Sequence, residues 1–204
     1  MARPQLIVAL DVREALTGLT ISERLGDSIG FYRIGLGMLT GGALALANEL
    51  KQQHGKSILL DLRLGGIAEE VADAVHGLAQ FEIDYLTVDN DVEVLRAGTS
   101  AVSGTATRIL AAHRDHSNAA RVATMADDAF AAGAHGIIVP AISVATVRQR
   151  PAANGKLVIA NGLDAGEHAA EALRGGADHV VVGRSITEAA DPVRAASDLL
   201  ATLP

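Results

Sequence analysis

Eight short runs of Val, Ile and Leu, each followed by a stretch of helical character, are the feature that most restricts how this chain can fold. Such runs are typical of buried parallel strands, because helices cover both faces of a parallel sheet. Strands are expected at residues 5–11, 29–35, 57–63, 83–89, 108–112, 136–140, 156–160 and 179–183. The first helix is expected to run to about residue 25, and the others to lie at 41–53, 67–78, 92–97, 121–132, 143–149, 164–174 and 187–203.

The repeated strand–helix unit predicts an α/β fold. Eight units, with no linker and no change in composition, predict a single (β/α)8 TIM barrel domain over residues 1–204. An open, doubly wound sheet is the alternative. Such a sheet usually has fewer strands, and the glycine-rich dinucleotide-binding turn is missing after the first expected strand.

The composition indicates a globular protein and excludes several classes of partner. Hydrophobic residues make up 49% of the 204 residues and charged residues 20%, but aromatic residues only 2%. With a net charge of −7 as well, no surface for nucleic acid is expected. The absence of cysteine excludes disulfides and thiolate metal sites. No apolar run resembles a signal peptide or a membrane span, so a cytoplasmic protein without membrane contact is expected.

Charged and small residues gather where the expected strands end. In a TIM barrel the carboxyl ends of the strands form one rim, and catalytic groups lie there. Each residue alone has a structural explanation, such as a helix cap or a turn, but the whole set indicates a functional site. Its members are Asp11, Arg33, Asp61, Arg63, Asp89, Ser117, Pro140, Asn161, Gly162, Gly183 and Arg184.

The third expected strand, SILLDLR, carries Asp61 and Arg63 close to its end. Residues two apart on a strand point to the same side, so the two side chains are expected to lie together. When this segment is taken alone, a simple ion pair at a strand end explains it equally well. The other rim residues favour a ligand-binding site.

The ends of the seventh and eighth strands indicate phosphate binding. Gly162 follows the seventh strand, and Gly183 and Arg184 follow the eighth, where TIM barrels often hold phosphate. Glycines allow backbone N–H groups to approach phosphate oxygens, and an arginine adds a forked cation. Two ordinary strand–helix turns are the alternative. The expected ligand is a nucleotide or sugar phosphate.

Four segments resemble those of the orotidine 5′-phosphate decarboxylase family, and together they extend over nearly the whole chain. Residues 6–12 (LIVALDV) resemble its first strand with a substrate-contacting Asp. Residues 25–35 (LGDSIGFYRIG) resemble its Y-K-x-G segment, and residues 60–71 (LDLRLGGIAEEV) its signature D-x-K-x-x-D-I-P-x-T-V. Residues 181–192 (VVGRSITEAADP) resemble its terminal phosphate-binding segment.

The resemblance implies a homodimeric carboxy-lyase that converts orotidine 5′-monophosphate to uridine 5′-monophosphate without a metal or other cofactor. The family uses an alternating Lys-Asp-Lys-Asp array, and the catalytic residues at its first three positions are Arg33, Asp61 and Arg63. The substrate-binding residues are expected to be Asp11, Ser117, Gly162, Gly183 and Arg184.

The differences from the family pattern fall on its chemistry. The family's second lysine protonates the ring carbon as carbon dioxide leaves, whereas Arg63 carries a guanidinium, which is a very poor proton donor. Gly66 replaces the second Asp of the array. Glu70 stands where the family signature has a threonine, and Asp89 stands where the fourth strand usually ends in a histidine-like residue. The loop after the seventh strand is short. Orotidylate turnover is therefore expected to be slow or absent.

Two other functions stay open from the sequence. One is a sister enzyme of the hexulose-phosphate synthase or keto-gulonate-phosphate decarboxylase type, assisted by a metal at Asp61 and Asp89. Those enzymes carry an acidic residue where this chain has Arg33, which argues against them. The other is a barrel that binds a phosphate ligand without catalysis. His113 and His116 form a close pair near the expected rim, and we interpret them first as loop residues.

Overall fold

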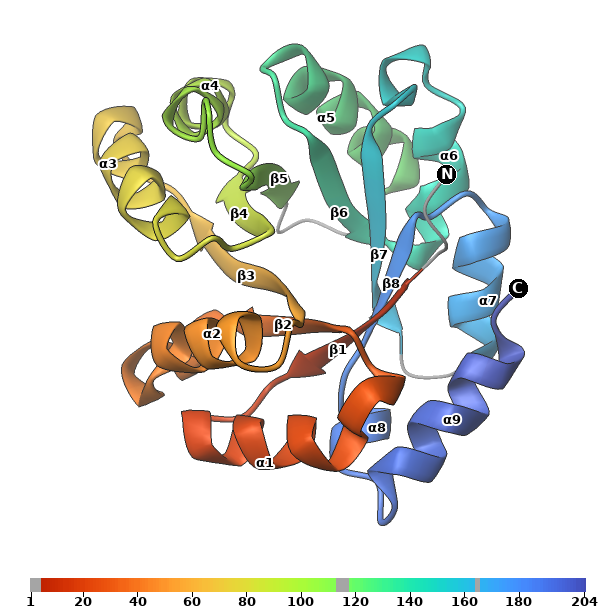
Figure 1. Cartoon of the computed structure of the whole chain (residues 1–204). Coiled ribbons are helices and arrows are strands. Elements are labelled where there is room, and N and C mark those ends of the chain that lie inside the picture. Colours follow the sequence, from red (N-terminus) through yellow and green to blue (C-terminus); the bar gives the residue numbers. More distant parts are fainter. Residues whose placement is uncertain (1–4, 113–117, 164–165) are drawn as a thin grey trace.

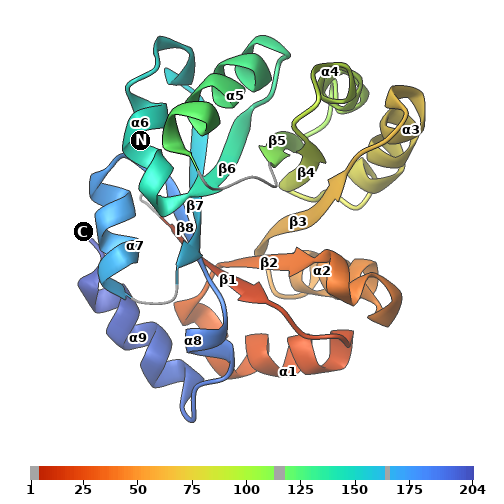
Figure 2. The same cartoon turned by 180° about the vertical axis from the view of Figure 1, so that it is seen from behind.

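The computed structural model describes residues 5–112, 118–163 and 166–204. Within these ranges eight parallel strands close into a barrel in chain order, and helices surround it (Figures 1 and 2). The strands are Gln5–Leu10 (β1), Phe31–Gly35 (β2), Ser57–Leu64 (β3), Tyr85–Asp89 (β4), Arg108–Ala112 (β5), Gly136–Pro140 (β6), Leu157–Leu163 (β7) and His179–Val182 (β8). The helices are Ala15–Leu25 (α1), Ala43–Gln52 (α2), Ala68–Ala79 (α3), Val92–Ala101 (α4), Ala119–Ala131 (α5), Val144–Arg148 (α6), Gly166–Arg174 (α7), Arg184–Thr187 (α8) and Pro192–Thr202 (α9). None of the helices described here is long and apolar enough to cross a membrane.

The predicted TIM barrel is confirmed, and β5 and β6 have the predicted bounds. The last helix, predicted at 187–203, begins later, at Pro192 (α9), and residues 184–187 form the separate short helix α8. α8 ends at Thr187, and Asp191 caps α9, its side chain accepting a hydrogen bond from the Arg194 N–H at 3.1 Å, while Pro192 occupies the first turn of α9. β7 also continues to Leu163, beyond its predicted end at residue 160.

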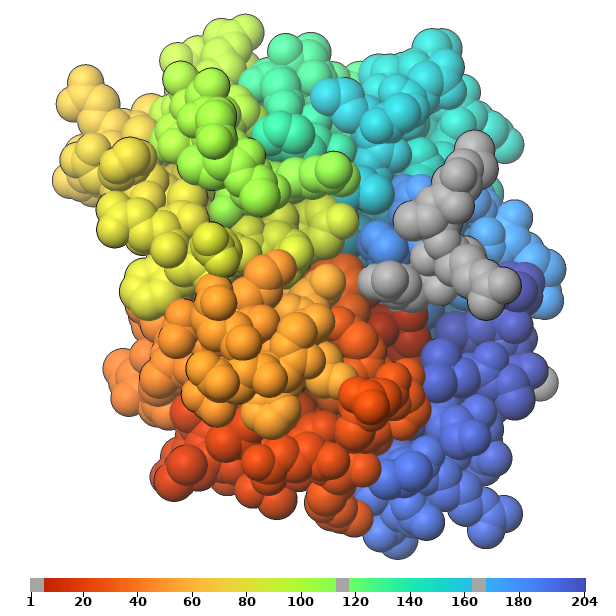
Figure 3. Space-filling model, in the orientation of Figure 1, coloured from red at the N-terminus to blue at the C-terminus, as the bar shows by residue number. Residues whose placement is uncertain are grey.

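The two ends of the chain meet in the barrel wall. β1 pairs with β8 in parallel, from Gln5 opposite His179 to Val8 opposite Val182. Outside the wall, α1 packs against α9, and Figure 3 shows the red and blue segments adjoining at the lower side of the molecule. Because this pairing closes the barrel, neither β1 nor β8 is left as an open sheet edge.

Alternate residues of each strand point into the barrel and toward the helices. Along β1, Ile7 and Ala9 belong to an inner apolar cluster, whereas Leu6 and Val8 belong to the outer cluster that packs against the helices. The remaining fully apolar members of the inner cluster are Phe31, Leu59, Leu110, Ile138, Ile159 and Val181. These side chains fill the middle of the barrel, so its polar chemistry is confined to the two ends.

Three strands at the amino end of the barrel begin in the same way. The residue directly before β4, β6 or β8 has a polar side chain. That side chain accepts a hydrogen bond from the backbone N–H of the second residue of β3, β5 or β7, respectively. The pairs are Ile58 N to Asp84 Oδ2 at 2.8 Å, Ile109 N to His135 Nδ1 at 3.1 Å and Val158 N to Asp178 Oδ2 at 2.7 Å. These bonds satisfy backbone donors that strand pairing leaves unpaired at this end.

Arg148 of α6 joins several loops at the same end. Its Nε donates to the Gly176 carbonyl at 2.6 Å, and its Nη1 donates to the carbonyls of Lys156 at 2.8 Å and Ala153 at 3.2 Å. Its Nη2 forms an ion pair with Asp178. One guanidinium therefore links the loop before β7 to the loop before β8.

Candidate active site

Four charged side chains at the carboxyl end of the barrel form an alternating row across β1, β2 and β3. Arg33 lies between two carboxylates: its Nη2 donates to Asp11 Oδ1 at 3.1 Å, and its Nε is 3.3 Å from Asp61 Oδ2. Arg63 continues the row, with its Nε 3.5 Å from Asp61 Oδ1. All four follow inward-facing positions of their strands, which is why they meet at the mouth of the barrel.

Asp61 is the most buried member of this row. Its side chain is 5% exposed, against 43% for Asp11. A fully buried neighbour, Thr87 of β4, donates from Oγ1 to Asp61 Oδ1 at 2.8 Å. A carboxylate removed from water in this way is tolerated only with several partners, and here it has one hydroxyl and two guanidinium groups.

Thr87 also holds the backbone beside Asp61. Its Oγ1 accepts a hydrogen bond from the Arg63 N–H at 2.8 Å. Arg63 has a φ of 49°, which is uncommon for a residue other than glycine, and the pairing of β3 with β4 shifts between Leu60 and Leu64. Irregular strand ends of this kind redirect a side chain, and here the Arg63 guanidinium lies against Asp61.

Glycines border the row where other side chains would crowd it. A Cβ atom on Gly183 would lie 3.3 Å from Asp11 Oδ2, and one on Gly65 would lie 3.2 Å from the Asp89 Cβ. Gly66 meets no such crowding, but its φ of +126° is a conformation that residues with side chains rarely adopt. The loop from β3 to α3 therefore depends on glycine for both space and backbone conformation.

The residues expected to bind phosphate lie at the ends of β7 and β8. Gly162, predicted in a turn after the strand, instead lies within the irregular end of β7, with a φ of +73° and a shift in pairing to β8 between Ala160 and Leu163. Arg184 is exposed at the start of α8, and within the described ranges its side chain forms no hydrogen bond or ion pair. Ser117, like His113 and His116, lies outside the described residues.

Thr87 is the site residue that sequence analysis missed. It stands two residues before Asp89 on β4, so it shares the inward direction of that rim position. Applying the two-residue periodicity to every rim residue would have identified it. Among the residues described, no group of three or more His, Asp or Glu side chains is placed to hold a metal ion.

The chain matches the family described as orotidine 5′-phosphate decarboxylase / HUMPS over residues 4–94 and 92–199. It belongs to this family. A relative from Ruegeria pomeroyi named orotidine 5′-phosphate decarboxylase is 44% identical over 228 residues, covering 100% of this chain and 95% of that protein. A Jannaschia relative with the same name is 43% identical and covers both chains fully.

Solved structures agree with this assignment at the level of fold. Orotidine 5′-phosphate decarboxylase from Lactobacillus acidophilus superposes with a TM-score of 0.87 at 24% identity, covering 98% of this chain and 99% of the other. An uncharacterized conserved protein from Geobacillus kaustophilus superposes with a TM-score of 0.84 at 25% identity, covering 98% and 100%. The family fold is thus retained over the whole described chain.

The chain is also shorter than its relatives. The alignment to the Ruegeria protein has 228 positions and includes all 204 residues here, so about 24 positions have no counterpart in this chain. One short connection is that between β7 and α7, which comprises only residues 164 and 165.

Proposed function

We propose that this chain binds orotidine 5′-monophosphate or a closely related pyrimidine nucleotide at the carboxyl end of its barrel, in the cytoplasm, and decarboxylates it slowly at best. The observation that carries the proposal is the alternating row of Asp11, Arg33, Asp61 and Arg63. Relatives at 44% and 43% identity named orotidine 5′-phosphate decarboxylase support the choice of substrate.

The row supplies charge but lacks a proton donor. Two guanidinium groups beside the buried Asp61 can stabilise negative charge that develops on the pyrimidine ring when the carboxylate leaves. The ring carbon must then receive a proton, and a guanidinium gives one up very poorly. Losing a positioned general acid typically costs about 10²–10⁴ in rate.

The phosphate group of the nucleotide is assigned to Arg184, with backbone N–H groups near Gly162 and Gly183. In support, Arg184 is exposed and has no partner within the described ranges. Gly183 follows β8 directly, and a Cβ atom on it would lie 3.3 Å from Asp11 Oδ2. The proposed phosphate site therefore adjoins the charged row. Charge-assisted contacts with a guanidinium are the usual basis of phosphate recognition.

A homodimer is part of the proposal. Leu36 and Leu39 follow β2, Ile67 follows β3 and Ile142 follows β6, and all four are large apolar side chains between 46% and 74% exposed. Apolar side chains gathered on one rim favour burial against a second copy of the chain. We expect sedimentation velocity to give a dimer mass, and Leu36→Glu with Ile67→Glu to give a monomer. Val193→Glu on α9 is the control and should leave the mass unchanged.

The decisive experiment follows the loss of orotidylate absorbance with time. The wild type should turn over slowly or not at all, and Arg63→Lys alone should change little because the residues of such an array act as a unit. Arg63→Lys with Gly66→Asp should raise the rate about tenfold or more by supplying the acid and second carboxylate, and adding Arg33→Lys should raise it further. Thermal melting of each variant controls for the strain expected at Gly66.

Two results would change this assignment. Fast turnover by the wild type would show that arginine serves in place of lysine. A folded triple variant that binds the nucleotide without turnover would favour a barrel that binds its ligand without catalysis.

A further inference from the structure

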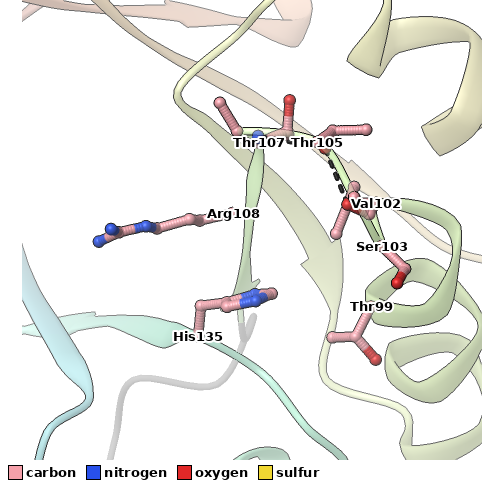
Figure 4. A pocket seen from close by; sticks show the side chains of 9 residues that line it. Thr99, Val102, Ser103, Thr105, Thr107, Arg108 and His135 are labelled. Carbon is pink, nitrogen blue, oxygen red and sulfur yellow. Dashed lines mark hydrogen bonds between the residues drawn. The ribbon is translucent and has the colours of Figure 1, made fainter.

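A cavity of about 1000 Å³ lies at the amino end of the barrel, opposite the charged row. Its walls include Arg108, His135, Lys156, Leu157, Asp178 and His179. A second cavity of about 480 Å³, shown in Figure 4, shares Arg108 and His135 with it. The larger volume is at the upper end of the range found for small-molecule sites.

Aromatic side chains separate this cavity from the candidate active site. His179 lines the cavity and packs edge-on against Phe31, with ring centroids 5.6 Å apart. Phe31 in turn stacks on Tyr85 at 5.5 Å. Because Phe31 belongs to the apolar cluster that fills the barrel, a ligand at the amino end cannot also reach Asp61.

The charges around the cavity do not balance. The two nearby carboxylates are already paired, Asp178 with Arg148 and Asp84 with Lys51. Arg108 and Lys156 form no ion pair with any carboxylate in the described ranges. Arg108 is exposed and contacts the hydroxyl of Tyr85, and Lys156 donates from Nζ to the Ala134 carbonyl at 2.8 Å. Two positive charges therefore remain in a chain whose net charge is −7.

His135 adds a hydrogen-bond donor beside these cations. Its Nδ1 accepts the Ile109 N–H, so the neutral ring carries its proton on Nε2. Burial, with the nearby charges of Lys156 and Arg108, lowers the pKa of His135 from its ordinary value, which keeps the ring neutral near pH 7. Figure 4 shows the extended Arg108 side chain above the ring of His135.

From this arrangement we infer that the amino-end cavity binds a phosphomonoester that carries an apolar or aromatic group. The two unpaired cations match the charge of a phosphate dianion, and the His135 Nε2–H supplies a further donor. The apolar parts of the wall, such as Leu157, Ala153 and Ala177, suit the rest of the ligand. This site is distinct from the proposed nucleotide site and does not depend on it.

The test is titration calorimetry with phenyl phosphate, in a background of Arg184→Ala so that the carboxyl-end site is weakened. Phenyl phosphate should still bind this variant. Adding Arg108→Gln with Lys156→Met should weaken binding about tenfold or more, because two charge-assisted contacts are lost. Adding Arg24→Gln with Arg174→Gln instead removes the same charge from exposed helix positions and should leave binding unchanged.

Three outcomes would overturn the inference: no binding to the Arg184→Ala protein, equal weakening by the cavity variant and the charge control, or unchanged binding in the cavity variant. If Lys156→Met lowers stability, Arg108→Gln alone serves as the cavity variant, since the contact described for Arg108 is with the Tyr85 hydroxyl. A melting curve for each protein separates lost binding from lost folding.

Discussion

The two ends of the barrel use charged side chains in different ways. At the carboxyl end, Asp11, Arg33, Asp61 and Arg63 pair mainly with one another. At the amino end, the polar groups bond to the backbone, as Asp178 does to the Val158 N–H. Asp178, which holds the backbone and is also paired with Arg148, is committed to the fold, whereas the carboxyl-end groups that hold one another can exchange a partner for a ligand.

Thr87 combines the two kinds of contact, because it bonds both to the backbone and to a charged side chain. It lies at the carboxyl end, yet it accepts the Arg63 N–H and donates to Asp61. The row is therefore anchored to the sheet through one buried hydroxyl. We expect substitution of Arg148 at the amino end to cost mainly stability, substitution of Arg184 at the carboxyl end to cost mainly nucleotide binding, and substitution of Thr87 to cost both.

The largest loss of stability is expected from Arg148→Met at the amino end. The change removes hydrogen bonds to three carbonyls and leaves Asp178 without its cation, which should lower the free energy of unfolding by about 2–4 kcal/mol. Urea denaturation followed by circular dichroism measures it. Arg150→Met, which removes an exposed pair with Asp127, is the matched control and should cost little stability, because solvent screens an exposed ion pair. Equal losses in both variants would contradict the structural role of Arg148.

At the carboxyl end, Arg184→Ala should weaken binding of uridine 5′-monophosphate by about 1.5–3 kcal/mol while leaving the unfolding curve unchanged. The reason is that Arg184 makes no contact within the described residues that the fold would lose. Titration calorimetry measures the affinity. Unchanged affinity would remove Arg184 from the phosphate site, and a large loss of stability would break the contrast between the two ends.

Thr87→Val should give an intermediate effect on both properties. Valine keeps the shape but leaves the Arg63 N–H and one oxygen of Asp61 without their partner, so a loss of about 1–2 kcal/mol in unfolding free energy is expected. Nucleotide affinity should fall as well, because Asp61 and Arg63 lose their common anchor. Thr87→Ser keeps the hydroxyl and should restore most of both. A valine variant as stable and as tight-binding as the wild type would show that the row positions itself.

The smallest effect concerns acid sensitivity at the amino end. The pKa of His135 is lowered in the folded state by burial and by Lys156 and Arg108, so as the pH falls the unfolded chain takes up this proton first. The folded state should therefore lose stability below about pH 6.5. His135→Asn, which keeps a side-chain acceptor, should reduce that loss in melting temperatures measured from pH 8 to pH 5. The exposed His76→Asn should not, and an identical pH profile for His135→Asn would exclude this contribution.

The residues at the rim could largely be predicted, because their positions depend on short repeats that are visible in the amino-acid sequence. The alternation of apolar runs with helices predicts the barrel, and the two-residue repeat of a strand places Asp61 and Arg63 on one side. The later start of the last helix was also visible in principle, since Asp191 and Pro192 are a standard helix start. The prediction failed there because the apolar pattern on both sides is continuous.

By itself, then, the sequence determined the barrel and the rim that carries the charges. Only the tertiary structure decided which residues touch. Thr87 meets Asp61 because β3 and β4 are neighbours with an irregular register, and no local pattern encodes that register. The amino-end cavity brings Arg108 together with Lys156 and His179 from three separate strand starts. Closing the barrel is the physical step that unites them, because it places eight distant segments on one ring.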